Sequence, residues 1–281
     1  MSAQMIANSH KPVMLTKVLQ CLLQNNPSVV VDGTYGAGGH ARALLSQLPA
    51  HAKMYGIDRD PIALNYLIVD PRFTFIPGNF SQIPSYNLPL IDALLLDLGP
   101  SSMQLDSVHR GFSFRHDSPL DMRMDQEGST AKEVLQKITT SQLHELLMLV
   151  NEPKAYEIAV ELVKAARYIV GTMDVVKIIQ RCYGTVTKIN SKHIATKTFL
   201  ALRMLVNSEL EHTVNTLHLL SKFMAPNGIV GIITFHSWED RQVKLALKQT
   251  PGKSISFTPC TSEIKRNPRS RSARLRVLQL T

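Results

Sequence analysis

The sequence predicts an α/β fold, a doubly wound and mostly parallel sheet with an inserted all-α subdomain. Three observations predict it. Short apolar runs that end in an acid alternate with helical patterns over residues 14–98. Helical patterns then follow one another from about residue 130 to 183, and the alternation returns after residue 226. Strands that alternate with helices indicate a parallel sheet with right-handed crossovers, so the helical stretch is an insertion.

The first hundred residues supply the first four strands. A helix over 14–24 comes first, because Leu15, Val18, Leu19 and Leu22 recur at helical spacing. Apolar runs closed by an acid, a glycine or a proline then predict strands at 29–31, 54–58, 73–76 and 91–96. Helices are expected between them at 41–45 and 61–69, the second opened by a proline, whose missing N–H costs nothing in a first turn.

The inserted helices and the last strand follow. Thr130 and Glu133 form a capping box, and an apolar stripe over 155–166 predicts a packed helix. One or two helices are expected over 193–223, a turn at 226–228, a strand at 229–235 and a helix at 239–248. Residues 264–281 are expected to form a basic tail, since they hold six lysines and arginines and no acid. No internal repeat is visible.

Composition limits the classes of function. The chain has 281 residues, of which 44% are hydrophobic and 19% charged, enough apolar material for a sizeable core. Its charge of +9 fits either a nucleic-acid partner or a moderately basic enzyme. Three scattered cysteines (Cys21, Cys182 and Cys260) without a CxxC pair argue against a zinc ribbon or a disulfide framework, so a reducing compartment and no metal are expected.

Membrane and export signals are not visible either. No apolar run approaches the roughly 18 residues that a membrane-spanning helix needs. Residues 1–8 show neither a basic and apolar secretory signal nor the arginines of a mitochondrial presequence. We therefore expect a chain without a membrane partner.

The strongest local signal is the glycine cluster over 31–40, between the first strand and its helix. Glycine lets a backbone turn sharply and approach a ligand closely. A tight turn with a purely structural role would show the same glycine cluster. Asp58 ends the second strand, 20 residues beyond Gly38, and an acid there suits the hydroxyls of a ribose. Dinucleotides and S-adenosylmethionine both fit this pattern, whereas the GxxxxGK[ST] phosphate loop is absent.

Two further strand ends separate these cofactors. Phe80 follows the third strand, where an aromatic ring could cover an adenine or could belong to the core. Asp97 ends the fourth strand and is followed by Gly99, Pro100 and Ser101 at the carboxyl edge of the sheet, where ligands bind in such folds. This turn resembles the acceptor loop of amino-group methyltransferases, without their paired prolines and aromatic residue.

Ten segments of the chain together resemble one family closely, in the family's order, from His10 to about Arg276. That family is the RsmH/MraW group of small-subunit ribosomal RNA cytosine-N4 methyltransferases. The segments are HKPVML (10–15), DGTYGAGGH (32–40), GIDRDP (56–61), LDLGPSSMQLD (96–106), RGFSF (110–114), PLDMRMD (119–125), ATKTF (195–199), VNSEL (206–210), FHSWEDR (235–241) and NPRSRS (267–272).

The resemblance implies a Rossmann-like class I methyltransferase fold with S-adenosylmethionine as cofactor. It implies a cofactor domain at 1–104 and 206–281, and a helical substrate-recognition subdomain at 105–205. The substrate it implies is a cytidine in the decoding region of small-subunit ribosomal RNA, and we keep a homodimer among the expected partners. The expected cofactor residues are Gly36, Gly38, Gly39, His40, Asp58, Phe80, Asp97 and Gln104.

The catalytic prediction centres on Asp97, which with the carbonyls of residues 98–100 could accept the N–H groups of the cytosine amine; cofactor binding alone is the alternative for Asp97. Ser101 and His236 complete the catalytic set, with Ser237 and Asp240 beside them unless Ser237 only caps a helix and Asp240 is solvated. The pair Pro259–Cys260 is too far downstream for a C5-cytosine mechanism. Phosphate contacts are expected from Arg110, Arg115, Arg123, Arg269, Arg271 and Arg274.

Departures from the family and three other functions remain open. Trp238 replaces a usual leucine, Tyr35 a common phenylalanine, and the region 240–265 is short. Segments 102–106 and 193–197 resemble the animal mitochondrial branch, which favours the mitochondrial matrix over a bacterial-type cytoplasm. The alternatives are a dinucleotide-dependent oxidoreductase, a non-catalytic ribosome-assembly factor, and a methyltransferase for amino groups of other nucleic acids.

Overall fold

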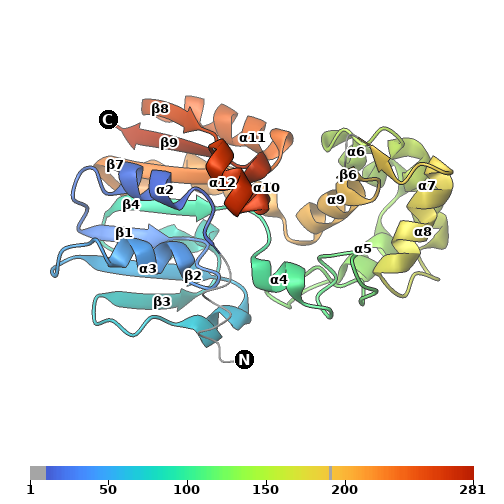
Figure 1. Ribbon diagram of the computed structural model, residues 1–281, viewed down its shortest axis with the longest axis horizontal. Coiled ribbons are helices and arrows are strands. Elements are labelled where there is room, and N and C mark those ends of the chain that lie inside the picture. Colours follow the sequence, from blue (N-terminus) through green and yellow to red (C-terminus); the bar gives the residue numbers. More distant parts are fainter. Residues whose placement is uncertain (1–10, 190–191) are drawn as a thin grey trace. The chain divides into compact units, whose positions relative to one another are not determined.

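The computed structural model describes residues 11–189 and 192–281, so His10 of the first family segment lies outside the described residues. The chain divides into two compact units (Figure 1). The first unit comprises Met1–Gly99 and Leu210–Thr281, and the second comprises Pro100–Glu209. The subdomain predicted at 105–205 falls within the second unit, and its role in substrate recognition stays a prediction.

A seven-stranded sheet in the order β3-β2-β1-β4-β7-β9-β8 organises the first unit. The first five strands in this order are parallel, and β9 runs antiparallel to β7 and β8. The predicted doubly wound, mostly parallel α/β sheet is confirmed. The strands are β1 (Val29–Asp32), β2 (Lys53–Asp58), β3 (Phe73–Pro77), β4 (Ile91–Asp97), β7 (Met224–Thr234), β8 (Gly252–Phe257) and β9 (Arg274–Leu280).

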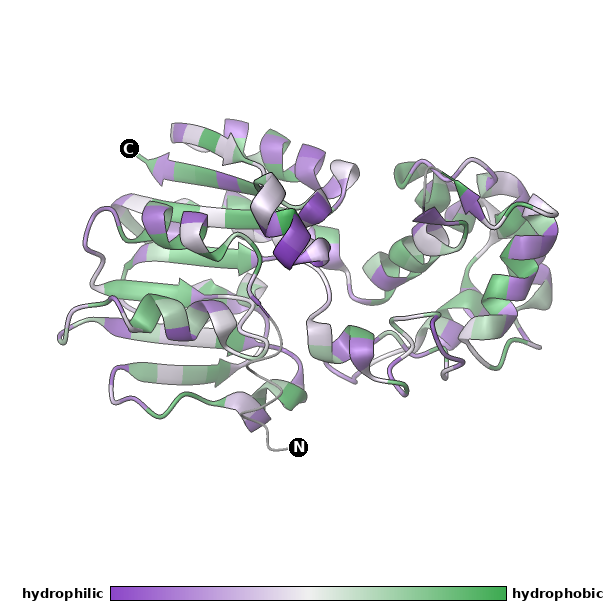
Figure 2. Cartoon of the chain, in the orientation of Figure 1, coloured by the Kyte–Doolittle hydropathy of each residue, from purple (hydrophilic) through white to green (hydrophobic). Residues whose placement is uncertain are grey.

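Helices cover both faces of this sheet because neighbouring strand residues point to opposite sides. Val30 packs with α2 and α3 on one face, whereas Val31 packs with α10 and α11 on the other. Figure 2 shows β4 as hydrophobic along most of its length, as expected for a strand that is buried on both faces. The helices are α2 (Leu15–Leu22), α3 (Gly39–Leu45), α10 (Glu209–His218), α11 (Ser237–Lys248) and α12 (Thr261–Arg266), with 3₁₀ turns η1 (Pro61–Tyr66), η2 (Phe80–Ser85), η3 (Leu220–Lys222) and η4 (Pro268–Ser272).

The second unit is a helical bundle with one short hairpin, and side-chain caps begin several of its helices. The predicted capping box of Thr130 and Glu133 is present, with reciprocal bonds of 3.2 and 2.8 Å. Asn207 connects α9 to the 119–125 loop, since its amide group accepts from Met124 N and donates to Met122 O. The elements are α4 (Ser102–Asp106), α5 (Ala131–Lys137), α6 (Thr140–Leu149), α7 (Ala155–Ala165), α8 (Thr172–Tyr183), α9 (Thr196–Val206), β5 (Lys188–Ile189) and β6 (Lys192–His193).

Three predicted elements need correction. The helix expected at 61–69 is a 3₁₀ turn that ends at Tyr66. The turn expected at 226–228 lies inside β7, which begins at Met224 and has a register irregularity against β4. The basic tail is folded: its last residues form β9, where Leu275 and Val277 are buried and alternate with Arg274 and Arg276. Among the described residues, no helix is long and apolar enough to cross a bilayer.

Candidate active site

Three acids mark the carboxyl ends of adjacent parallel strands in the first unit. Asp32 on β1 lies opposite Gly56 of β2 and Leu95 of β4 in the sheet register. Asp58 lies two residues after Gly56, and Asp97 lies two residues after Leu95. The two acids therefore extend equally far beyond Asp32, one on each side of β1. In an open α/β sheet, ligands bind at this edge, next to the strand where the order of connections reverses.

The loop after β1 is bonded to both neighbouring strand ends. Gly36 N donates to Asp58 Oδ2 at 2.6 Å, and Asp97 N donates to Thr34 Oγ1 at 2.7 Å. Tyr35 N donates to the carbonyl of Ile57 at 3.0 Å. The structure therefore brings the predicted glycine loop, Asp58 and Asp97 together through direct hydrogen bonds.

Glycine is required in this loop for two reasons, both visible at Gly38. Its φ of +73° is a left-handed conformation that side chains disfavour. A Cβ there would also lie 2.6 Å from the hydroxyl of Tyr35, which is buried and donates to Tyr66 O. Gly36 has a positive φ as well, and Gly39 opens α3 directly after the loop. The predicted cofactor glycines thus form a cradle in which glycine is favoured by a positive φ, at Gly36 and Gly38, or by a Cβ contact of 2.6 Å, at Gly38 and Gly39.

Beside this cradle lie buried polar atoms with open hydrogen-bonding capacity. His40, in the first turn of α3, is buried, and its Nε2 lies 3.5 Å from Asp97 Oδ2. Within the described residues, neither ring nitrogen of His40 has a hydrogen-bond partner, nor do Asp97 Oδ1 and Asp32 Oδ2. Buried polar atoms are normally hydrogen-bonded, so a cluster of unsatisfied ones is typical of a binding site.

Burial also changes the acidity of two of these groups. Burial raises the pKa of Asp32 to about 6, against the opposing effect of the nearby His40 ring. The pKa of Asp58 is likewise raised by burial to about 6, although its oxygens accept from the N–H groups of Asp60 and Gly36. Raised carboxyl pKa values in a cluster are typical of functional sites.

Phe80 lies at the start of η2, after β3. It is partly buried and packs against the core on the α10 and α11 face. Its Cβ would lie 3.0 Å from a Cβ added to Gly33. The ring therefore has a core contact and stands next to the glycine loop, which is compatible with both roles expected for it.

His236 comes after β7, two residues beyond Thr234, and its place differs from the simplest expectation. His236, and not Ser237, caps α11, because its Nδ1 accepts from Glu239 N at 3.3 Å. Its Nε2 lies 3.5 Å from Glu239 Oε1 and has no hydrogen-bond partner among the described residues. The alternative of a solvated Asp240 is wrong, because Arg276 binds this carboxylate at 2.7 and 2.9 Å.

Ser101 and Gln104 belong to the second unit, where they form a capping box at the start of α4. Ser101 N donates to Gln104 Oε1 at 2.9 Å, and Ser101 Oγ accepts from Gln104 N at 3.2 Å. Gln104 is buried. Both side chains thus fix the local backbone, and their catalytic and cofactor roles stay predictions.

The predicted RNA-binding arginines fall into two groups. Arg110 donates to the carbonyls of Arg123 and Met124, and Arg123 forms a bidentate pair with Asp121, so both support the 119–125 loop. Arg274 lies on β9, 3.5 Å from Asp240. The exposed members of the set are Arg115, Arg269 and Arg271.

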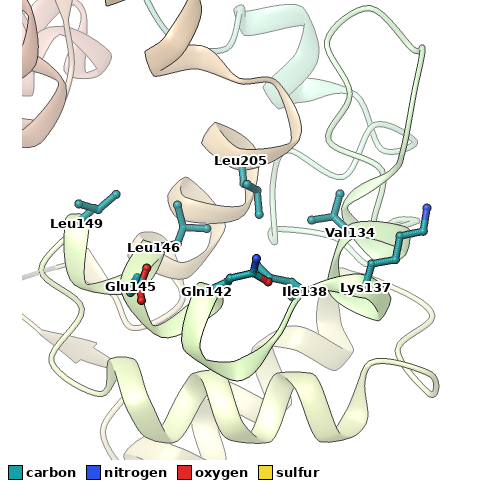
Figure 3. Close-up of a pocket in the computed structure, with 8 residues that line it drawn as sticks. All are labelled: Val134, Lys137, Ile138, Gln142, Glu145, Leu146, Leu149 and Leu205. Carbon is teal, nitrogen blue, oxygen red and sulfur yellow. The ribbon is translucent and has the colours of Figure 1, made fainter.

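A groove of about 590 Å³ lies elsewhere, on the helices of the second unit (Figure 3). Leu146, Leu149 and Leu205 line it together with the stem of Lys137. None of the predicted site residues contributes to its lining, so it is separate from the strand-end cluster.

Comparison with known proteins places these features in a family. The model of the MraW methylase family matches residues 7–281. The chain belongs to this family. It is 37% identical over 297 residues to "Ribosomal RNA small subunit methyltransferase H" of Bartonella henselae, covering 95% of this chain and 85% of that protein. A protein of the same name from Myxococcus xanthus is 37% identical over 302 residues, covering 96% and 97% of the two chains.

In this methylase, sequence reasoning missed two members of the strand-end cluster. Asp32 was not among the predicted site residues, although it is 1% exposed and has an unsatisfied oxygen. Thr34 was not singled out, although its hydroxyl accepts from the backbone of Asp97. An acid directly after a run of three valines was the available signal for Asp32, while nothing in the sequence pattern indicated the contact of Thr34.

Proposed function

We propose that this chain transfers a methyl group from S-adenosylmethionine to N4 of a cytidine in small-subunit ribosomal RNA. The observation that carries the proposal is the match of the MraW methylase family to nearly the whole chain. The names of the two relatives, which specify ribosomal RNA of the small subunit, support the choice of substrate. The choice of a cytidine N4 in the decoding region rests on the family resemblance.

The residues present fit S-adenosylmethionine. Two backbone N–H groups orient the Asp58 carboxylate, and each oxygen keeps a lone pair that can accept from a ribose hydroxyl. The unsatisfied Oδ1 of Asp97 and the ring nitrogens of His40 offer further polar contacts at the same edge. The glycine loop itself lies at this edge, since Gly36 N donates to Asp58 and Thr34 accepts from Asp97 N.

When bound, the cofactor supplies a sulfonium methyl group. The chain's own task is to hold a weakly nucleophilic cytosine amine in line with that methyl, and such positioning can contribute roughly 7–11 kcal/mol. Positive charge develops on the amine nitrogen, so carboxylate and carbonyl acceptors that are already in place stabilise the transition state. Asp97 supplies such an acceptor, because Thr34 fixes its backbone and its Oδ1 has no other partner among the described residues.

Methyl transfer to small ribosomal subunits tests the proposal. Subunits are incubated with the chain and labelled S-adenosylmethionine, and the RNA is digested for nucleoside mass spectrometry. We expect a new N4-methylcytidine signal that requires Asp97. Cofactor binding without transfer to subunits would contradict the substrate and point to another nucleic acid, tested by offering duplex DNA and other RNAs. If the chain neither binds the cofactor nor transfers a methyl group, a non-catalytic ribosome-assembly factor is favoured. A nicotinamide absorbance change on cofactor addition would favour an oxidoreductase.

Two finer parts of the proposal have separate tests. The proposed location in the mitochondrial matrix rests on the resemblance of segments 102–106 and 193–197 to the animal mitochondrial branch. The two relatives named above come from bacteria. Fractionation of cells that express a tagged chain distinguishes the compartments. For the homodimer, equilibrium sedimentation would give twice the monomer mass of 31.3 kDa, and the monomer mass would contradict it.

A further inference from the structure

A group of three aromatic rings lies in the second unit, and none of the three belongs to the predicted cofactor or catalytic residues. The ring centroids of Phe114 and His193 are 4.8 Å apart with planes inclined by 32°, and Phe114 meets Phe199 edge-on at 4.9 Å. Phe199 is buried and supports the stack from the core, whereas Phe114 and His193 are half-buried. Phe114, the central ring, and His193 are thus held by ring contacts and remain partly accessible to solvent.

His193 is held in place by its hairpin. Its Nδ1 accepts from Ala195 N at 3.2 Å, which fixes the ring and leaves Nε2 as the nitrogen that bears the proton in the neutral form. In the register of β5 and β6, Lys188 lies directly opposite His193, and Lys192 pairs with Ile189. Directly opposite residues of an antiparallel pair project to the same face, so Lys188 lies beside the His193 ring.

The charge around this hairpin is one-sided. Residues 175–208 contain six lysines and arginines and no acid. Lys177 and Arg203 pair with acids outside this stretch, and Lys197 donates to the carbonyl of Asn151. Lys188 and Lys192 are exposed and form no ion pair with any residue that the structure describes. Arg115, directly after Phe114, is exposed as well.

We propose that Phe114 and His193, with Lys188, Lys192 and Arg115, form a binding site for a single-stranded stretch of RNA. The rings would stack against one unpaired base, and the three cations would contact the neighbouring phosphates. Stacking platforms within a basic surface are the usual means of binding unpaired nucleic acid, because every base has an aromatic face. This inference rests on the proposed function, since it names a contact of the same RNA substrate.

The two aromatic rings favour RNA over an acidic protein as the partner of this site. Lysines and arginines alone would serve either, but an acidic peptide gains nothing specific from a histidine that stacks on a phenylalanine. If removing the His193 ring weakens binding while the lysines are kept, the bound group is therefore a base. Because Phe199 supports the Phe114 ring edge-on, the Phe114 ring is already in place before binding and loses little conformational entropy when a base binds.

Fluorescence anisotropy with a labelled single-stranded RNA oligonucleotide, and separately with small ribosomal subunits, tests the site. His193→Ala should weaken binding of both probes about tenfold, the effect of losing one stacking partner. His193→Phe should restore most of this loss because it returns an aromatic face. The double variant Lys188→Ala/Lys192→Ala should reduce the slope of log Kd against log salt by about 1.4, for two lost phosphate contacts on a single strand.

The matched control is Lys132→Ala/Lys137→Ala, which removes two lysines from α5 of the same unit and should leave the salt slope nearly unchanged. Wild-type affinity in His193→Ala, an equal loss in His193→Phe, or no RNA binding by the unaltered chain would each overturn the proposal. Methyl transfer and cofactor binding are measured in parallel. RNA binding that depends on His193 without any methyl transfer would defeat the proposed function alone, whereas transfer with unchanged RNA affinity in His193→Ala would defeat this site alone.

Discussion

His40 Nε2 lies 3.5 Å from Asp97 Oδ2, and this pair joins the helix after the glycine loop to the end of β4. Asp97 Oδ1 is buried without a hydrogen-bond partner among the described residues. The Asp97 carboxylate therefore has one oxygen beside His40 and a second oxygen that can accept a hydrogen bond. It lies at the edge of the sheet where substrate and cofactor are expected to bind. Its side chain is the first to test.

Asp97→Ala should abolish detectable methyl transfer, because it removes the acceptor that we propose for the cytosine amine. Loss of one preorganised electrostatic partner typically lowers kcat by about 10²- to 10³-fold. Single-turnover transfer to small ribosomal subunits measures this rate. Glu211→Ala, which removes an exposed acid, is the matched control and should retain full activity. A near-normal kcat in folded Asp97→Ala would refute the catalytic role and leave cofactor binding as the only one.

Gly38→Ala should impair both folding and cofactor binding. An alanine at φ +73° costs about 1–2 kcal/mol by itself. Gly128 is a near-perfect control, since its φ is +71° and a Cβ there meets nothing within 4 Å. The extra loss in Gly38→Ala relative to Gly128→Ala therefore reports the collisions with the Tyr35 hydroxyl and the Arg42 guanidinium. Urea unfolding and cofactor titration by calorimetry measure it, and equal losses in the two variants would contradict the cradle.

Much of this site could be predicted from the sequence, because each acid that closes a buried strand is visible in the pattern. Asp58 and Asp97 end apolar runs, and parallel strands bring such ends to one edge. The contact between His40 and Asp97 could not be predicted, since it depends on the rotation of α3 against β4. His236 as a helix cap was also hidden, because serine is the usual residue in that position and Ser237 stands next to it.

Two strands escaped prediction for opposite reasons. β8 is almost entirely exposed, so it shows no alternation of apolar and polar residues. β9 does alternate, but its arginines at 274 and 276 dominate the local composition and suggest a solvated tail. The partly buried Arg276 forms an ion pair with Asp240, which is 36 residues away in the chain. Local patterns cannot report such a partner.

Arg276→Ala should therefore destabilise the fold, because it leaves the partly buried Asp240 carboxylate without its bidentate partner. Hydrogen bonds to charged groups contribute about 2 kcal/mol, and removing one partner of a buried pair costs at least that much. The free energy of unfolding in urea measures the loss. Arg271→Ala, at an exposed position, should change it by less than about 0.5 kcal/mol. Equal stability of the two variants would show that the ion pair contributes nothing.

Asp32→Asn should make the protein more stable at neutral pH. Burial raises the pKa of Asp32 from its ordinary value of 3.8 to about 6. Between these values the folded chain binds more protons than the unfolded chain, so this group lowers stability as the pH rises, by up to about 3 kcal/mol above pH 6. Asparagine carries no charge, and its Oδ1 can still accept from Thr34 N.

The gain should consequently vanish below about pH 4, where aspartate is protonated in both states. Urea unfolding across this pH range gives the difference between variant and parent. The exposed Glu127→Gln is the control, and its difference should stay flat. A variant that is no more stable than its parent at neutral pH would contradict the penalty assigned to the buried charge. If transfer is also lost while stability rises, Asp32 serves the site at the expense of the fold, as strained functional groups do.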